Sequence, residues 1–173
     1  MFEDLLPTVH SIVSGVFETM FFIILEPVEG DENIDLPKKN KGEENSRENG
    51  SAGFFRSTID FQGDYSGEIT LFLPTPLARS MTANFLGFGE EEVTESQALD
   101  MAGEITNMIS GNLFSLLNKK EGSKLSMPKT EIVSTLGPQV QDQGSPRSLM
   151  ADFYGEAQRI RVKVQFDSGK MSD

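Results

Sequence analysis

The sequence predicts an α+β fold, a two-layer sandwich in which two long helices cover one face of a mainly antiparallel sheet. Two long segments with helical periodicity are each followed by segments that alternate like the two strands of a hairpin. The same order of elements occurs in both halves of the chain, which indicates an internal duplication. Two helix-plus-hairpin halves bury their apolar sides most simply by sharing one sheet.

The first predicted helix covers residues 5–26, with Pro7 near its first turn and Pro27 just past its end. Its core stripe consists of Ile12, Val16 and Ile23, and further apolar residues (Phe17, Met20, Phe21, Phe22 and Leu25) make it apolar almost all round. Such a helix is expected to be buried on most sides or covered by a partner. Residues 28–53 are rich in Asn, Glu, Lys and Gly, and predict a flexible, solvated loop insertion.

A hairpin is predicted next, with strands at residues 55–61 and 68–73 and a turn between them. Residues 75–86 predict a short helix, with Thr75 as N-cap and Gly87 after its end. An acidic connection then leads to Thr94, which is expected to cap the long second helix together with Gln97 in a capping box.

The second long helix has one apolar side and one polar side. The predicted core side consists of Ala98, Ala102, Ile105, Ile109, Leu113 and Leu116. The predicted polar side consists of Asp100, Glu104, Asn107, Gly111 and Asn118. Glu104 and Asn107 are neighbours on this side because they are three residues apart. The helix contains no Lys or Arg, and Gly103 and Gly111 lie close to the polar side, so another molecule is expected to approach it closely.

After the long helix, positive charge and Gly122 mark its end, and residues 129–135 predict a strand. Residues 137–147 predict a loop. A second hairpin follows, with strands at 148–154 and 158–166, and the tail from residue 167 is polar.

Composition limits the function classes. A chain of 173 residues is predicted to form a single domain, residues 1–173. There is no Cys and only one His, so disulfides and Cys- or His-rich metal sites are excluded. The net charge of −12 argues against nucleic acid or an anionic membrane as partner. The longest apolar run, residues 20–25, is too short to span a bilayer, and Met1 is not followed by a basic segment. These features predict an acidic cytoplasmic protein.

The repeat is carried by short matches in a shared order. Residues 59–63 (Ile-Asp-Phe-Gln-Gly) match residues 151–155 (Ala-Asp-Phe-Tyr-Gly), and the two aspartates, each near a turn glycine, are expected to be structural. In the second helix, Asp100, Glu104 and Asn107 follow the spacing Asp-x-x-x-Glu-x-x-Asn. In the first helix the same spacing gives Ser14, Glu18 and Phe21.

An internally duplicated Asp/Ser-x-x-x-Glu-x-x-Asn motif on a long helix resembles the CheC/CheX/FliY phosphatases of bacterial chemotaxis. Gly111-Asn112 after the motif makes the chain most similar to the CheX branch. Because Phe21 replaces the Asn in the first copy, the resemblance implies one active site. The family tends to place a Pro after the motif, for which Pro128 is the candidate, although its spacing is slightly short.

The resemblance implies hydrolysis of the phospho-aspartate of a CheY-type receiver domain, in chemotaxis or related two-component signalling. Asn107 would orient the attacking water, and Glu104 would pair with a cation on the receiver. The implied partner contacts are Asp100, Gly103, Gly111 and Asn112. The chain is expected to carry no cofactor or metal of its own, because the receiver brings Mg²⁺, and to form a homodimer.

Two alternatives remain open. The chain could be a non-catalytic binding module of the same fold that recognises a receiver or a flagellar component. It could also be an acidic assembly protein without a receiver partner, whose Glu/Asn face is only solvated.

Overall fold

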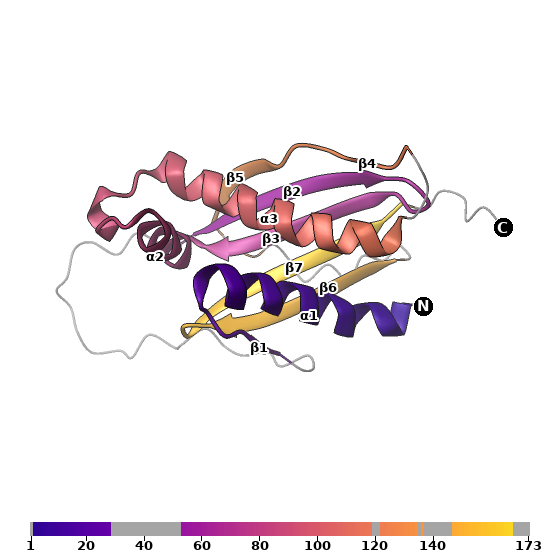
Figure 1. Ribbon diagram of the computed structural model, residues 1–173, viewed down its shortest axis with the longest axis horizontal. Coiled ribbons are helices and arrows are strands. Elements are labelled where there is room, and N and C mark those ends of the chain that lie inside the picture. Colours follow the sequence, from indigo (N-terminus) through magenta and orange to yellow (C-terminus); the bar gives the residue numbers. More distant parts are fainter. Residues whose placement is uncertain (1, 29–52, 119–121, 135, 137–146, 168–173) are drawn as a thin grey trace.

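The computed structural model describes residues 2–28, 53–118, 122–134, 136 and 147–167. Its helices are α1 (Phe2–Phe21), α2 (Thr75–Leu86), a 3₁₀ turn (Glu90–Glu92) and α3 (Glu95–Leu117). Its strands are β1 (Glu26–Pro27), β2 (Phe54–Gln62), β3 (Gly67–Pro74), β4 (Lys124–Leu125), β5 (Lys129–Val133), β6 (Ser148–Gly155) and β7 (Gln158–Phe166). Helices α1 and α3 lie next to each other on one face of the sheet (Figure 1), which confirms the predicted α+β sandwich.

All strand pairs of the sheet are antiparallel, in the order β1-β6-β7-β3-β2-β4, with β5 also paired to β2. Each half of the chain sends an edge strand to the hairpin of the other half: β1 follows α1 and pairs with β6, while β4 follows α3 and pairs with β2. Equivalent hydrogen bonds hold the two edges, since Val28 N donates to Asp152 O (2.8 Å) and Ser126 N donates to Asp60 O (2.9 Å). The repeat seen in the sequence is therefore also a repeat in space.

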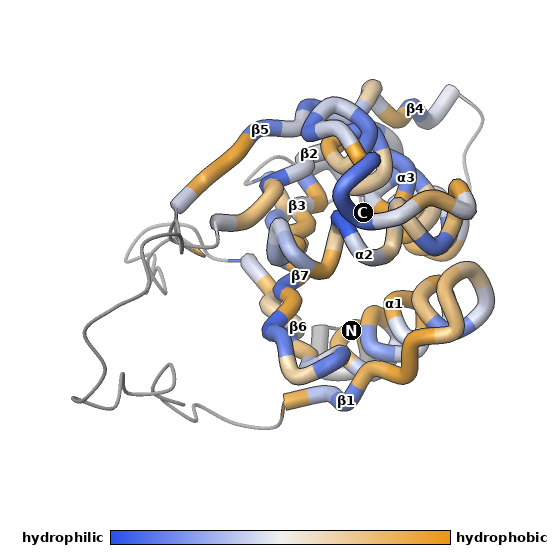
Figure 2. The backbone as a smooth tube through the Cα atoms, turned by 90° about the vertical axis from the view of Figure 1, so that its left-hand side faces the viewer, coloured by the Kyte–Doolittle hydropathy of each residue, from blue (hydrophilic) through white to orange (hydrophobic). Residues whose placement is uncertain are grey.

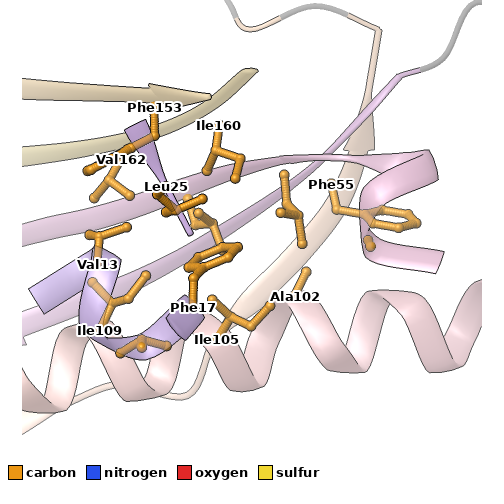
Figure 3. Packing of buried hydrophobic residues seen from close by; sticks show 14 of the residues in the cluster. Val13, Phe17, Leu25, Phe55, Ala102, Ile105, Ile109, Phe153, Ile160 and Val162 are labelled. Atoms are coloured by element: carbon orange, nitrogen blue, oxygen red, sulfur yellow. The ribbon is translucent and has the colours of Figure 1, made fainter. Parts of the chain in front are cut away.

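The core lies between the sheet and the helices. Side chains of α1 and α3 meet the inner face of the strands, as Figure 3 shows for Phe17, Ile105 and Ile160. The end-on view in Figure 2 shows the helices and the sheet as two layers. The predicted core side of α3 is buried as far as Leu113, but Leu116 is 57% exposed. Leu117, four residues after Leu113, packs against the core instead, so the prediction for Leu116 is wrong.

The first helix ends earlier than predicted. Phe21 is its last residue, and Phe22 has a left-handed backbone (φ 57°), which stops the helix. The chain is then extended: Ile23 and Leu25 are buried while Ile24 between them is 78% exposed. Burial therefore follows the period of a strand, which a short run of apolar residues cannot distinguish from a helix in sequence alone.

The other helix ends agree with the sequence-based predictions, apart from two that need correction. The capping box of Thr94 and Gln97 and the left-handed Gly87 are confirmed. Thr75, however, is the first helical residue, and Pro74 precedes it without a side-chain cap. Asn118 is not on the polar side of α3: the helix ends at Leu117, and Asn118 is buried, with its Oδ1 accepting a hydrogen bond from Tyr65 N (3.0 Å). Most of the predicted loops 28–53 and 137–147 (residues 29–52 and 137–146) and residues 119–121 lie outside the described residues.

An ion cluster fixes the outer face of the second hairpin. Arg161 donates two hydrogen bonds to Asp152, from Nε to Oδ1 (2.7 Å) and from Nη2 to Oδ2 (2.8 Å), and Arg159 also donates to Asp152. Burial by itself would raise the pKa of Asp152, but the hydrogen bonds from Arg161 and Arg159 outweigh it, so its pKa lies below the ordinary value of 3.8. Both aspartates of the repeat are thus structural, since Asp60 pairs with Lys129 (3.4 Å) on the same face.

Asp152→Asn is expected to lower the free energy of unfolding by about 2 kcal/mol at neutral pH, because two guanidinium groups lose a largely buried charged partner. A carboxylate with a lowered folded-state pKa stabilises the fold above its unfolded pKa, and this contribution is lost as the pH falls through the folded value. The gap between parent and variant in urea unfolding should therefore be full above about pH 5 and shrink below it. Asp60→Asn is the matched control, with an expected cost below about 0.5 kcal/mol because its pair is exposed. An equal cost for both, or no change with pH, would contradict this assignment.

Candidate functional site

The candidate site is the outward side of α3. Its N-terminus is held by the capping box, in which Gln97 N donates to Thr94 Oγ1 (3.2 Å) and Thr94 N donates to Gln97 Oε1 (2.9 Å). Its inner side is anchored by fully buried residues (Ala98, Ala102, Ile105, Ile109 and Leu113). The helix is therefore a rigid support, and the directions of its outward side chains follow from helical geometry.

Four residues form the outward row that we name the α3 ridge: Asp100, Glu104, Asn107 and Gly111. Asp100 and Glu104 are exposed, whereas Asn107 and Gly111 are half-buried. Their spacing of three or four residues places them in one line along the helix. Among the described residues, neither Glu104 nor Asn107 makes a side-chain hydrogen bond or ion pair. The carboxylate and the carboxamide are thus adjacent and open to another molecule.

The charged side chains of the α3 ridge are all acidic. Asp100 and Glu104 are its charged groups, and no Lys or Arg occurs from Ser80 to Asn118. In the part of the chain that the structure describes, no group of three or more His, Asp or Glu side chains could hold a metal ion. Two hollows lie elsewhere, one of about 560 Å³ beside Arg79 and Ile132 and one of about 310 Å³ on the outer face of the sheet beside Lys163. An exposed helix face outside these hollows suits a substrate carried on another macromolecule better than a small free molecule.

The two glycines of the site differ. At Gly111 an added Cβ would meet nothing within 4 Å, so another molecule can come close to the backbone there. Gly103 is buried, and its Cβ position is 3.4 Å from Pro128 Cγ and 3.5 Å from Thr130 Oγ1. The prediction that Gly103 contacts a partner is therefore wrong, because its bare backbone accommodates the chain's own edge strand.

Asn112, the other predicted partner contact, is exposed but lies on a different side of α3 from Asn107. The two residues are five positions apart, which rotates one from the other by about 140°. The Asn112 amide also donates to Met108 O of its own helix (2.9 Å). The structure therefore brings Asp100, Glu104, Asn107 and Gly111 together and leaves Asn112 beside this row.

Pro128 belongs to the site, although sequence reasoning gave it no role. Its ring packs on Gly103, one turn before Asn107 on the same side of α3. The contact joins α3 to the edge of the sheet between β4 and β5. Only the family tendency towards a Pro after the motif pointed to it, because nothing in the local sequence shows that the edge strand returns to this turn of the helix.

The equivalent position on α1 is closed by packing. Phe21 stands where α3 has Asn107, and its ring contacts Phe17 (6.1 Å between centroids) and Phe85 of α2 (6.2 Å). Leu25, at the position equivalent to Gly111, is outside the helix and buried. Only Glu18 of the former motif remains exposed. The first copy thus serves as packing surface in this fold.

Glu18→Ala is expected to leave any activity of the α3 site within about twofold of the parent, because no carboxamide accompanies Glu18 and the ridge lies on another helix. The measurement is turnover by the variant and by Glu104→Ala in one phosphate-release assay. Equal losses in the two variants would mean that α1 also carries a working site.

Comparisons with known proteins agree with this geometry. The family model of the chemotaxis phosphatase CheX matches residues 55–153, more than half of the chain. Similar solved structures include the chemotaxis protein CheX from Vibrio vulnificus, with a TM-score of 0.64 and 18% identity, covering 92% of this chain and 93% of that one. The chemotaxis protein CheX from Desulfovibrio desulfuricans gives a TM-score of 0.61 and 18% identity, covering 95% and 99%.

A third similar structure is a complex. It is the CheX-CheY-BeF3-Mg²⁺ complex from Borrelia burgdorferi, with a TM-score of 0.60 and 15% identity, covering 92% of this chain and 96% of that one. At these identities the solved structures show a shared fold. Among curated proteins, no sequence matches the chain.

Proposed function

The chain belongs to the family of the chemotaxis phosphatase CheX, and from this membership we propose that its α3 ridge hydrolyses the phospho-aspartate of a CheY-type receiver domain. One observation carries the proposal: Glu104 and Asn107 lie side by side on a rigid helix, without partners among the described residues. The relative from Borrelia burgdorferi was solved with CheY, BeF3 and Mg²⁺, which supports a receiver as the partner here.

The reaction needs no strong covalent catalyst from the phosphatase. A phospho-aspartate is a mixed anhydride that is already activated, and phosphoryl transfer depends mainly on positioning and on neutralising charge. We assign the water to Asn107: its amide oxygen accepts a hydrogen bond from the attacking water and holds it in line with phosphorus. A half-buried side chain on a rigid helix loses little further freedom when it takes this role.

Glu104 is assigned to docking. It is exposed one turn from Asn107, and its carboxylate pairs with a cation of the receiver, most simply a lysine beside the phosphoryl group. Asp100 extends the negative edge by one further turn. Gly111 leaves room for the receiver backbone, since an added Cβ there would meet nothing within 4 Å.

A metal, in this proposal, is held by the receiver. The two ridge carboxylates, Asp100 and Glu104, are too few to enclose a divalent cation by themselves. Mg²⁺ on the receiver would neutralise charge on the phosphoryl oxygens. The chain's own residues then need only place the water and fix the docking register.

Two finer properties are part of the proposal. The chain is proposed to act in the cytoplasm, where receivers are phosphorylated. A separate observation is that none of the described helices has the length and hydropathy of a membrane span. It is also proposed to form a homodimer. Sedimentation of the purified chain tests the dimer, and a single monomeric species at micromolar concentration would contradict it.

The function is tested with a receiver that a small phosphodonor has phosphorylated. Substoichiometric amounts of this chain should shorten the lifetime of the phospho-receiver, with many receivers turned over per molecule. Binding to the receiver without a change in lifetime would instead identify a binding module. Neither binding nor acceleration, with every receiver encoded in the same genome, would contradict both interpretations.

A further inference from the structure

The edge strand beside the α3 ridge contains a β-bulge. Leu125 of β4 faces Phe61, and Lys129 of β5 faces Thr58. Between these pairs the edge strand has three residues, Ser126, Met127 and Pro128, while β2 has only two, Ile59 and Asp60. One extra residue on one strand defines a bulge, and bulges frequently redirect a side chain next to a functional site.

Hydrogen bonds hold this bulge in place. Ser126 N donates to Asp60 O (2.9 Å), and Asp60 N donates to Ser126 Oγ (2.9 Å). The Ser126 hydroxyl also donates to the carbonyl oxygen of Met127 (3.0 Å). On the other side, Pro128 packs on Gly103 of α3. The bulge is therefore anchored to both layers of the fold, and its middle residue is presented on a rigid support.

Met127 is that middle residue, and its side chain is 81% exposed. Pro128 packs beside Gly103, and Asn107 lies one turn after Gly103 on the same side of α3. Met127 directly precedes Pro128, and the chain runs from β4 to β5 in the direction opposite to α3 (Figure 1). An exposed apolar residue thus lies one position before the contact of Pro128 with α3.

A single exposed apolar residue is common on protein surfaces and by itself indicates nothing. Met127 differs because a bulge fixes its backbone and because it adjoins Pro128, which packs on α3 one turn before Asn107. The ridge offers that partner only negative charge and a carboxamide, which give specificity and a faster encounter more than affinity. A flexible, polarisable thioether beside them supplies apolar contact that adapts to the opposite surface.

We propose that Met127 is an apolar contact for the receiver and that it contributes to the affinity of the docked complex without taking part in the chemistry. This inference rests on the proposed function, because the partner that contacts Met127 is the receiver whose phospho-aspartate meets Asn107. The bulge then makes the edge strand the second contact of an interface whose first contact is the α3 ridge.

The test compares Met127→Ser with Met150→Ser, a matched control at a methionine of β6 that is 39% exposed in the other hairpin. Loss of the apolar contact should raise the KM for the phospho-receiver roughly fivefold to tenfold and leave kcat within about twofold. Met150→Ser should keep both parameters, and Met127→Leu should keep the KM within about twofold because the apolar volume is retained. Equal thermal melting of all variants verifies that each is folded.

The outcomes separate the two claims. If the parent accelerates hydrolysis and Met127→Ser has an unchanged KM, the contact is wrong while the function stands. If Met127→Ser loses self-association in sedimentation and keeps its KM, a second copy of the chain occupies this surface, and the inference is also wrong. If the parent accelerates nothing, the proposed function fails and takes the inference with it.

Discussion

Asn107→Ala is expected to remove most of the acceleration of receiver dephosphorylation, with a fall in kcat of about 100-fold. The methyl side chain cannot accept a hydrogen bond from water, so the nucleophile is no longer held in line with phosphorus. Docking should be largely preserved, because Glu104 and the rest of the α3 ridge remain. The measurement is phosphate release at several receiver concentrations, together with the Kd for a receiver activated by beryllofluoride.

Asn112→Ala is the matched control for this prediction. It removes a carboxamide from the same helix, but one that is exposed, rotated away from the ridge and bonded to Met108 O. Its kcat and KM should stay within about twofold of the parent. An Asn107→Ala protein with the parent's kcat, or an Asn112→Ala protein with the larger loss, would show that the water is positioned from elsewhere.

Glu104→Ala is expected to raise the KM for the phospho-receiver about tenfold, because a charged interfacial contact is lost. Turnover should fall as well, because the docked receiver is less precisely oriented. Because the interaction is electrostatic and exposed, the parent's KM should rise with ionic strength, and the variant's KM should depend on it less. The comparison is kcat/KM for both proteins at low and high salt. A variant with unchanged KM and unchanged salt dependence would exclude Glu104 from docking.

Much of the fold could be predicted because its elements carry local signals. The strand alternation in β2 and β7, Gly87 after α2 and the Thr94–Gln97 capping box place element boundaries to within one residue. The two-residue strands β1 and β4 were missed, since two residues show no periodicity. The end of α1 was missed because Phe22 leaves the helix in a left-handed conformation that the sequence of an apolar run does not reveal.

The candidate site could be predicted only where its residues are close together in the sequence. Glu104 and Asn107 share a helix, so their spacing fixes their proximity. Gly103 was misassigned because its neighbour Pro128 comes from the edge strand, and only the folded chain brings them together. The bulge at Met127 is also hidden in the sequence, since it exists only through the registers of β4 and β5 against β2. The packing of Phe21 against Phe85 of α2 could not be predicted either, because it too is a contact between residues far apart in the sequence.

The role of Asn107 in positioning the water is tested by a single-turnover measurement of phosphate release, with the protein in large excess over the phosphorylated receiver. Under this condition every receiver is docked, so the rate constant reports the chemical step alone. We expect the parent to shorten the lifetime of the phospho-receiver and Asn107→Ala to leave it close to that of the receiver by itself, even at saturation. A saturated Asn107→Ala protein that releases phosphate as fast as the parent would show that Asn107 does not position the attacking water.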